Sequence, residues 1–120
     1  MPVRSLDSSV LEWPDAKTVD NAVRRWAEGI GVLFAEIVRI GYFGSYARGD
    51  WGVGSDLDIV VIVDRAQERF ERRGAKWDVT GLPVPAEVMV YTVEEWGRIE
   101  GRFAKALSSQ TVWVYGRRTR

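Results

Sequence analysis

The sequence contains neither cysteine nor histidine. Without cysteine, the chain has no disulfide, no thiolate nucleophile and no cysteine–metal site. Without histidine, it lacks the most common general base and the most common ligand of soft metals. Any chemistry must therefore use carboxylates, hydroxyls, lysine, arginine or backbone amides, and carboxylates without histidine favour hard cations such as Mg²⁺ or Mn²⁺.

The chain also lacks an excess of either charge and any long apolar run. Its 17 lysines and arginines balance its 17 aspartates and glutamates, so we expect no direct nucleic-acid binding by the domain as a whole. A local basic patch at 117–120 is either a frayed tail or a surface that meets a partner or the partner's RNA. The longest apolar run, at 59–63, is far too short to cross a membrane. Because the first residues also lack a signal-peptide pattern, we expect a cytoplasmic protein.

A length of 120 residues fits one domain, 1–120, with 1–14 as a leader that packs late or stays mobile. Apolar residues at helical spacing follow Asp15 and Thr18, either of which can cap a helix, and Gly29 and Gly31 are expected to end that helix nearby. The other predicted elements are strands at 37–43, 56–63, 84–92 and 112–115, helices at 66–73 and 94–107, and a short helical turn with a loop at 46–55. This order predicts an α+β or α/β domain with a mixed sheet packed on helices.

Two acidic residues, Asp56 and Asp58, open the most apolar strand of the chain. Side chains at i and i+2 of a strand point to the same face, so the two carboxylates should lie side by side. Such like charges repel unless one takes up a proton or a divalent cation binds both. An exposed strand edge kept charged is the alternative interpretation, but the buried character of the remaining strand residues argues against it.

A bend at Gly44 and Ser45 precedes the acidic pair. A strand that runs into Gly-Ser and then a helical turn directs free backbone amides outward, and such amides bind phosphate. Arg48 either contacts a phosphate, holds the carboxylates in place, or pairs only with Asp50 at the surface. Trp51 either stacks on a base or, as we favour, covers the core. A phosphate cradle beside paired carboxylates implies a metal-bound nucleoside triphosphate.

The run Gly-Ser-x-Ala-Arg-Gly at 44–49, followed by Ser-Asp-x-Asp at 55–58, resembles the minimal nucleotidyltransferases of the DNA polymerase β superfamily. The resemblance extends over nearly the whole domain and implies a polymerase β-like palm fold. It implies a reaction that uses ATP or another nucleoside triphosphate with Mg²⁺ or Mn²⁺. It also implies catalytic metal ligands at Asp56 and Asp58, and triphosphate binding by Gly44, Ser45, Arg48 and Ser55.

The family has a third acidic residue on a neighbouring strand, which completes the metal site and helps to deprotonate the acceptor. The matching position here is Glu87, where the family usually has aspartate, so the longer side chain must fold back to reach the same metal. A solvated strand residue is the alternative for Glu87. Asp78 is a rival candidate that lies before the turn at 81–83.

The minimal members of this family are antitoxins paired with small helical HEPN-type toxins. The resemblance therefore implies that this chain adenylylates such a partner, on a tyrosine hydroxyl, and silences it. Two alternatives stay open: an antitoxin that neutralises its partner by binding alone, and a transferase acting on a small molecule of the aminoglycoside kind. We expect no separate acceptor domain within the 120 residues, which favours a protein acceptor, although a homo-oligomer would be another way to build an acceptor site.

Overall fold

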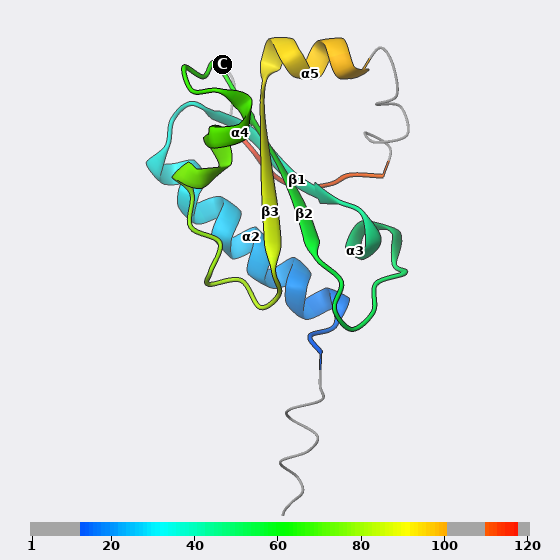
Figure 1. The fold of residues 1–120 in the computed structure, drawn as a ribbon. Coiled ribbons are helices and arrows are strands. Elements are labelled where there is room, and N and C mark those ends of the chain that lie inside the picture. The colour runs from blue at the N-terminus through cyan, green and yellow to red at the C-terminus, as the bar shows by residue number, and fades with distance from the viewer. Residues whose placement is uncertain (1–12, 101–109, 118–120) are drawn as a thin grey trace, which may run out of the picture.

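A computed structural model describes residues 13–100 and 110–117, without the side chain of residue 100. Figure 1 shows a sheet with helix α2 on one face and helix α5 across one end. No helix within these residues is long and apolar enough to span a membrane. In chain order the elements are α2 (Ala16–Leu33), β1 (Ile37–Phe43), α3 (Ser45–Arg48), β2 (Leu57–Val63), α4 (Phe70–Arg73), the 3₁₀ helix η1 (Gly74–Lys76), β3 (Ala86–Thr92), α5 (Val93–Glu100) and β4 (Val112–Gly116).

The four strands form one mixed sheet in the order β3-β2-β1-β4. Strand β1 is antiparallel to both of its neighbours, whereas β2 and β3 run parallel. The predicted α+β class is therefore confirmed, and the predicted strands at 37–43, 56–63, 84–92 and 112–115 are all present with bounds within two residues. The rest of the helix predicted at 94–107, including Phe103, lies outside the described residues beyond position 100.

Helix α2 begins where predicted, with the Asp15 carboxylate accepting a 2.8 Å hydrogen bond from the backbone N–H of Thr18. The prediction that the helix ends near Gly29 and Gly31 is confirmed, since α2 ends at Leu33, although both glycines are still part of the helix. Gly31 is buried against strand β4, and a Cβ at this position would collide with the Tyr115 ring. Gly31 is therefore retained for close packing of helix on sheet, which outweighs its low helix propensity.

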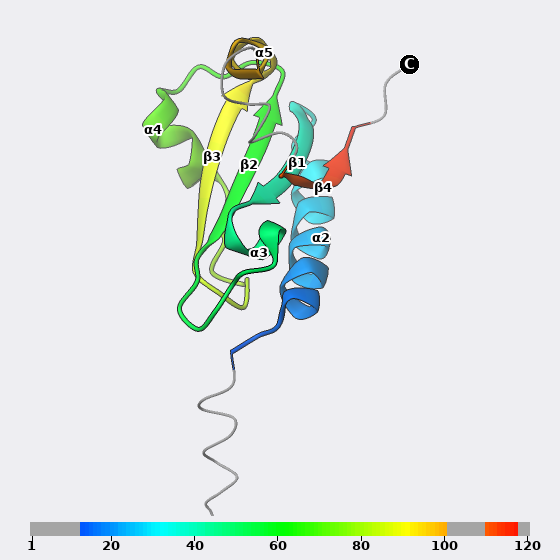
Figure 2. The ribbon, with the colours of Figure 1, turned by 90° about the vertical axis from the view of Figure 1, so that its right-hand side faces the viewer.

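The main core lies between α2 and the sheet face that Figure 2 shows edge-on against this helix. Val19, Val23 and Ala27 of α2 are fully buried there. A bulge between Ile37 and Arg39 shifts the register of β1 against β2. Because strand side chains alternate between faces, this extra residue allows both Ile37 and Ile40 to enter the same core.

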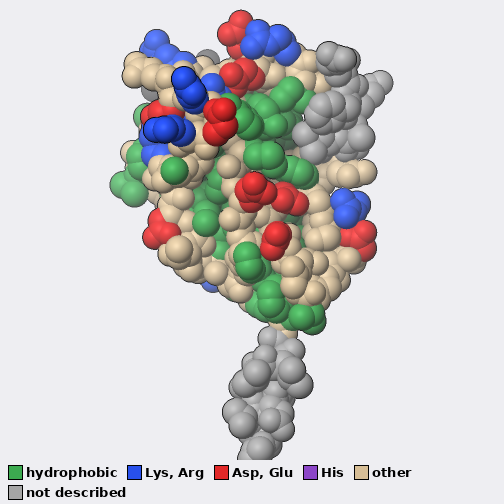
Figure 3. All heavy atoms as spheres, viewed as in Figure 1, with side chains coloured by type: hydrophobic (Ala, Val, Ile, Leu, Met, Phe, Trp, Pro, Cys, Tyr) green, Lys and Arg blue, Asp and Glu red, His purple; other side chains and the backbone are tan. Residues whose placement is uncertain are grey.

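Strand β2 is buried on both faces, as its continuous apolar run predicted. Val60 and Ile62 form a second cluster with Trp96 of α5, on the face away from α2. Figure 3 views this face and shows hydrophobic side chains gathered below α5. Strand β2 is therefore a rigid central element, and the residues at its start are held by a fully packed strand.

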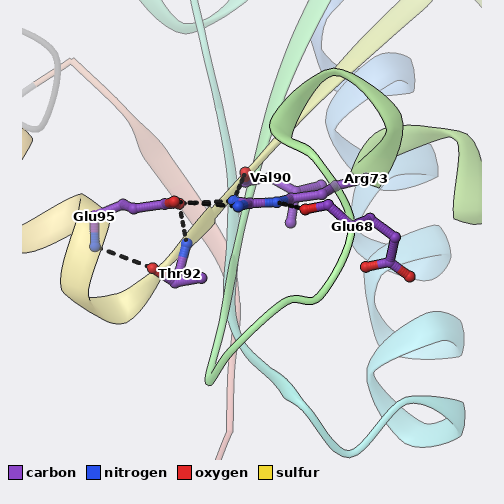
Figure 4. Close-up of polar contacts among 5 residues, drawn as sticks. All are labelled: Glu68, Arg73, Val90, Thr92 and Glu95. Atoms are coloured by element: carbon purple, nitrogen blue, oxygen red, sulfur yellow. Dashed lines mark hydrogen bonds and ion pairs between the residues drawn. The ribbon is translucent and has the colours of Figure 1, made fainter.

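The charged segment between β2 and β3 differs from its prediction. The helix predicted at 66–73 is reduced to α4 and continues as the 3₁₀ helix η1. The side chain of Arg73, in this charged segment, is only 10% exposed and pairs with Glu95 through two hydrogen bonds of 2.7 and 3.1 Å. It also donates to the backbone carbonyls of Glu68 and Val90, as Figure 4 shows. Because these tertiary contacts hold the segment, it adopts α4 and η1 and not one regular helix.

Glu95 is also half of a capping box at the start of α5. Its carboxylate accepts a bond from the backbone N–H of Thr92, and the Thr92 hydroxyl accepts one from the backbone N–H of Glu95. The bonds from Arg73 and then from Thr92 lower the pKa of Glu95 to about 2, although partial burial opposes this shift. The ionised carboxylate therefore ties α4, β3 and α5 together.

We predict that Glu95→Gln lowers the free energy of unfolding by about 2 kcal/mol at neutral pH. The pKa of Glu95 is about 2 in the folded chain and near 4.5 when unfolded. Its contribution is therefore complete above the unfolded value and is lost as pH falls toward the folded one. Urea unfolding should show a smaller difference in unfolding free energy between wild type and Glu95→Gln near pH 2 than at neutral pH. An equal difference at both pH values would contradict the proposed role of the charge.

We also predict that Gly31→Ala lowers the free energy of unfolding by about 1–3 kcal/mol, because its methyl group would displace the Tyr115 ring. Gly29→Ala is the matched control, since a Cβ there has nothing within 4 Å. The control should be neutral or more stable by up to about 1 kcal/mol. Equal responses of the two variants in urea unfolding would show that α2 and β4 do not pack as described.

Candidate active site

The bend after β1 is built on Gly44. Its φ of +87° is one that side-chain-bearing residues rarely adopt. Its carbonyl accepts bonds from the backbone N–H groups of Ala47 and Arg48, at 3.1 and 3.0 Å, which start the single turn α3. Gly49, at φ +90°, ends that turn. The predicted short helical turn is therefore present and is enclosed by two left-handed glycines.

Gly44 also lies directly against Asp58. A Cβ at position 44 would lie 2.5 Å from Oδ2 of Asp58, far inside van der Waals contact. Since Phe43 is the cross-strand neighbour of Asp58, the register of β1 on β2 fixes this approach. The Gly-Ser bend and the second aspartate thus form one continuous surface, as the motif spacing predicted.

Glu87 occupies the position next to Asp58 on the parallel strand β3. Paired residues on neighbouring strands direct their side chains to the same face, so both carboxyl groups lie on the face away from α2. Asp56 lies immediately before the first residue of β2, two positions from Asp58. Figure 3 shows acidic side chains gathered near the middle of this face. The structure therefore brings the three predicted acidic residues to one end of β2 and β3.

The electrostatics of Asp58 reflect this arrangement. Partial burial raises its pKa above the ordinary value, and the negative charges of Glu87 and Asp56 raise it further. Arg48 acts in the opposite direction and lowers the pKa. Asp56 and Glu87 themselves are exposed. Asp58 is consequently the half-buried centre of a group of repelling carboxylates.

The donor chemistry of this group suits a hard divalent cation. All three residues offer carboxylate oxygens, and a cation would relieve the repulsion that raises the pKa of Asp58. Within 13–100 and 110–117, however, no three acidic side chains are already arranged to hold a metal ion. The exposed side chains of Asp56 and Glu87 must therefore turn toward Asp58 for a cation to be held by all three.

The remaining residues predicted to bind phosphate have local partners here. Arg48 makes a 3.2 Å ion pair with Asp50, both largely exposed, and such pairs contribute little to stability. The Ser55 hydroxyl accepts a 2.8 Å bond from the backbone N–H of Gly52, which shapes the loop between α3 and β2. Neither bond prevents a contact with phosphate, because the Ser55 hydroxyl acts here only as an acceptor and the Arg48 guanidinium has further N–H donors beyond Nε.

Asp78 and Trp51 belong to other parts of the structure. The Asp78 carboxylate accepts two bonds from Thr80, at 2.9 and 2.7 Å, and these lower its pKa. Trp51 stacks on Tyr46 with ring centroids 5.5 Å apart and planes 10° apart, and packs against the main core. Trp51 thus serves in packing, the interpretation favoured from the sequence.

An enclosed cavity lies elsewhere, near the opposite ends of the same two strands. It is lined by Val63 and Val90, among others, whereas the carboxylates lie at positions 58 and 87. Its volume of about 10 Å³ is the space of one water molecule. This cavity is therefore too small for a nucleotide, and an open pocket of about 200 Å³ shares Glu36, Arg65 and Lys76 with it.

A sequence profile of the nucleotidyltransferase domain family matches residues 23–114. This chain belongs to the nucleotidyltransferase domain family. Among solved structures, the domain resembles a candidate nucleotidyltransferase from Sulfolobus solfataricus with a TM-score of 0.63 and 19% identity, over 85% of this chain and 84% of that one. At this identity the likeness concerns the fold alone. No curated protein matches the sequence.

One contact of this nucleotidyltransferase domain had no signal in the sequence. Trp13, within the segment predicted as a leader, donates a 2.7 Å hydrogen bond from Nε1 to the hydroxyl of Tyr46 on α3. The two residues are 33 positions apart, and no periodicity links them. The one available signal was the position of Trp13 two residues before the Asp15 cap, which places it near the start of α2.

We predict that Gly44→Ala lowers the rate of nucleotidyl transfer at least about ten-fold, because the new methyl group would displace the Asp58 carboxylate. Gly49→Ala is the matched control: it has a similar φ, but a Cβ there has nothing within 4 Å. Both variants should also lose stability, Gly49→Ala about 1–2 kcal/mol from its left-handed backbone, and Gly44→Ala about 1–3 kcal/mol from a φ/ψ combination that is essentially confined to glycine. Transfer kinetics with urea unfolding will separate the two effects, and equal losses of activity would contradict a contact between Gly44 and Asp58.

Proposed function

We propose that this domain transfers a nucleoside monophosphate, AMP from ATP, to a hydroxyl group with the help of a divalent cation. The observation that carries the proposal is the register of β2 on β3, which sets Glu87 beside Asp58 at the end of the sheet where Gly44 touches Asp58. Membership of the nucleotidyltransferase domain family supports the reaction class.

Each residue has a role in this proposal. Asp56, Asp58 and Glu87 would hold Mg²⁺ or Mn²⁺, which would supply charge neutralisation for the carboxylates and the triphosphate. The Gly44–Ser45 bend, with Arg48 and Ser55, would bind the triphosphate.

In the reaction itself, the acceptor hydroxyl oxygen forms a bond to the α-phosphorus while the bond to pyrophosphate breaks. Glu87 receives the hydroxyl proton or orients the group that does. Positioning and electrostatics would supply most of the rate enhancement.

The acceptor we propose is a protein, a HEPN-type helical toxin that is silenced by adenylylation of a tyrosine. The resemblance of the 44–58 motif to minimal nucleotidyltransferases supports this choice. The exposure of Asp56 and Glu87 on an outer face also fits, because a side chain of a large partner can reach them there. In this role the chain would act as the antitoxin.

A second candidate is an antitoxin that neutralises its partner by binding alone. It is favoured by one observation: among the residues that the structure describes, no three acidic side chains are already arranged around a cation site. Glutamate at position 87, one methylene longer than the usual family residue, also favours this candidate. In this case the fold and its surface would be retained without turnover.

One incubation separates the two candidates. The chain is mixed with labelled ATP, Mg²⁺ and a HEPN-type protein encoded by a neighbouring gene, and the intact mass of that protein is measured. A gain of one adenylyl group supports the transferase. Formation of a complex without a mass change supports binding alone. If no tested partner is modified or bound, small-molecule acceptors are assayed next.

We predict that Asp58→Asn reduces transfer by about a hundred-fold or more, because it removes the central metal-binding charge. Because partial burial and then the neighbouring carboxylates raise the pKa of Asp58, the Asp58→Asn variant should be at least as stable as the wild type by urea unfolding. Asp78→Asn is the control, because that carboxylate is engaged with Thr80. Full activity of Asp58→Asn would refute the proposed metal site.

A further inference from the structure

Tyr46 joins three segments that are separate in the sequence. It lies on α3, is 5% exposed, and its hydroxyl accepts the 2.7 Å bond from Nε1 of Trp13, just ahead of α2. Its ring stacks on Trp51, in the loop that leads to Asp56. The Trp13–Tyr46–Trp51 set therefore connects the entry of α2, the turn α3 and the loop before β2.

The turn α3 needs such an external support. A helix of four residues is far below the length at which helices are stable alone, so its position depends on tertiary contacts. Its cap Gly44 touches Asp58, and any tilt of α3 would move the Gly44–Ser45 bend relative to that carboxylate. The largest side chain of α3, and its one buried residue, is Tyr46.

We propose that Trp13 and Tyr46 are positioning residues, which hold the Gly44–Ser45 bend against Asp58 so that the bend can receive the triphosphate. This inference rests on the proposed function. Neither side chain reaches the carboxylates as a catalytic group. They act through α3, and Trp51 holds the loop before Asp56 against the same ring.

The energetic basis is a single, partly buried hydrogen bond between half-buried Trp13 and buried Tyr46. Removing one partner leaves the other without a bond in a site that is shielded from water, and the surrounding structure shifts to satisfy it. Removing both partners together leaves no unsatisfied hydrogen-bonding group, but α3 still loses its contact with the segment before α2. The two single variants and the double variant should therefore be strongly non-additive.

The first test does not depend on catalysis. Hydrogen exchange is measured at the amides of Ala47 and Arg48, which bond to the Gly44 carbonyl. In Trp13→Phe and Tyr46→Phe we expect exchange at both amides to be several-fold faster, with β2 amides unchanged. The matched control is Trp26→Phe, which also removes an indole N–H donor, here bonded to the Asp78 carbonyl at 2.8 Å. Unchanged exchange in Trp13→Phe would overturn the inference.

The second test is kinetic. In Trp13→Phe and Tyr46→Phe we expect KM for MgATP to rise roughly three- to ten-fold, the equivalent of one net hydrogen bond, with kcat within about two-fold. The double variant should be no worse than either single one. Trp26→Phe should leave KM unchanged.

The outcomes separate the two ideas. A merely structural role would lower the active fraction and hence the apparent kcat, leaving KM unchanged, and that result would overturn the inference. Should the wild type itself transfer no nucleotide with any acceptor, the proposed function fails, while the exchange measurement still decides whether the Trp13–Tyr46 bond holds α3 in place.

Discussion

The candidate site depends on how β2 pairs with β3. Their parallel register sets Asp58 and Glu87 side by side, and Asp56 lies two positions before Asp58 in the chain. Because these charges repel, the arrangement stabilises nothing by itself, as the raised pKa of Asp58 shows. The packing of β2 offsets this repulsion. Its apolar residues are packed on both faces, so the strand cannot shift to separate the charges. A slip of one residue would turn the whole apolar set over and is excluded by the core.

A second constraint acts from the other neighbour of β2. Strand β1 ends at Phe43, opposite Asp58, and the chain must then turn in close contact with that carboxylate without a steric clash. Glycine at 44 satisfies both conditions, since it adopts φ +87° and carries no Cβ to meet Oδ2. The Gly-Ser signature and the Asp-x-Asp signature are therefore one steric unit rather than two motifs that happen to be neighbours.

Much of this could be predicted from the sequence because it rests on local patterns. The Asp15 cap, the β2 run and the glycine bend follow from neighbouring residues, and the family motif fixed the fold class. What failed was decided by distant contacts. The helix predicted at 66–73 is shortened where Arg73 pairs with Glu95, and no local pattern indicated that the Tyr115 ring packs on Gly31. The bulge in β1 left no mark that periodicity could detect.

The two ends of β2 and β3 show how charge separates structure from function. Near their carboxyl ends, Glu95 is satisfied by Arg73 and Thr92, and its pKa falls to about 2. At their amino ends, the pKa of Asp58 is raised by burial and by the charges of Glu87 and Asp56. Within the described residues, no lysine or arginine forms a direct ion pair with these carboxylates, since Arg48 pairs with Asp50. A carboxylate already paired has nothing to gain from a metal ion, whereas one that is destabilised gains by binding it. The opposite pKa shifts of Glu95 and Asp58 thus distinguish a carboxylate that is satisfied within the fold from one that a cation would stabilise, which supports the metal site proposed at Asp58.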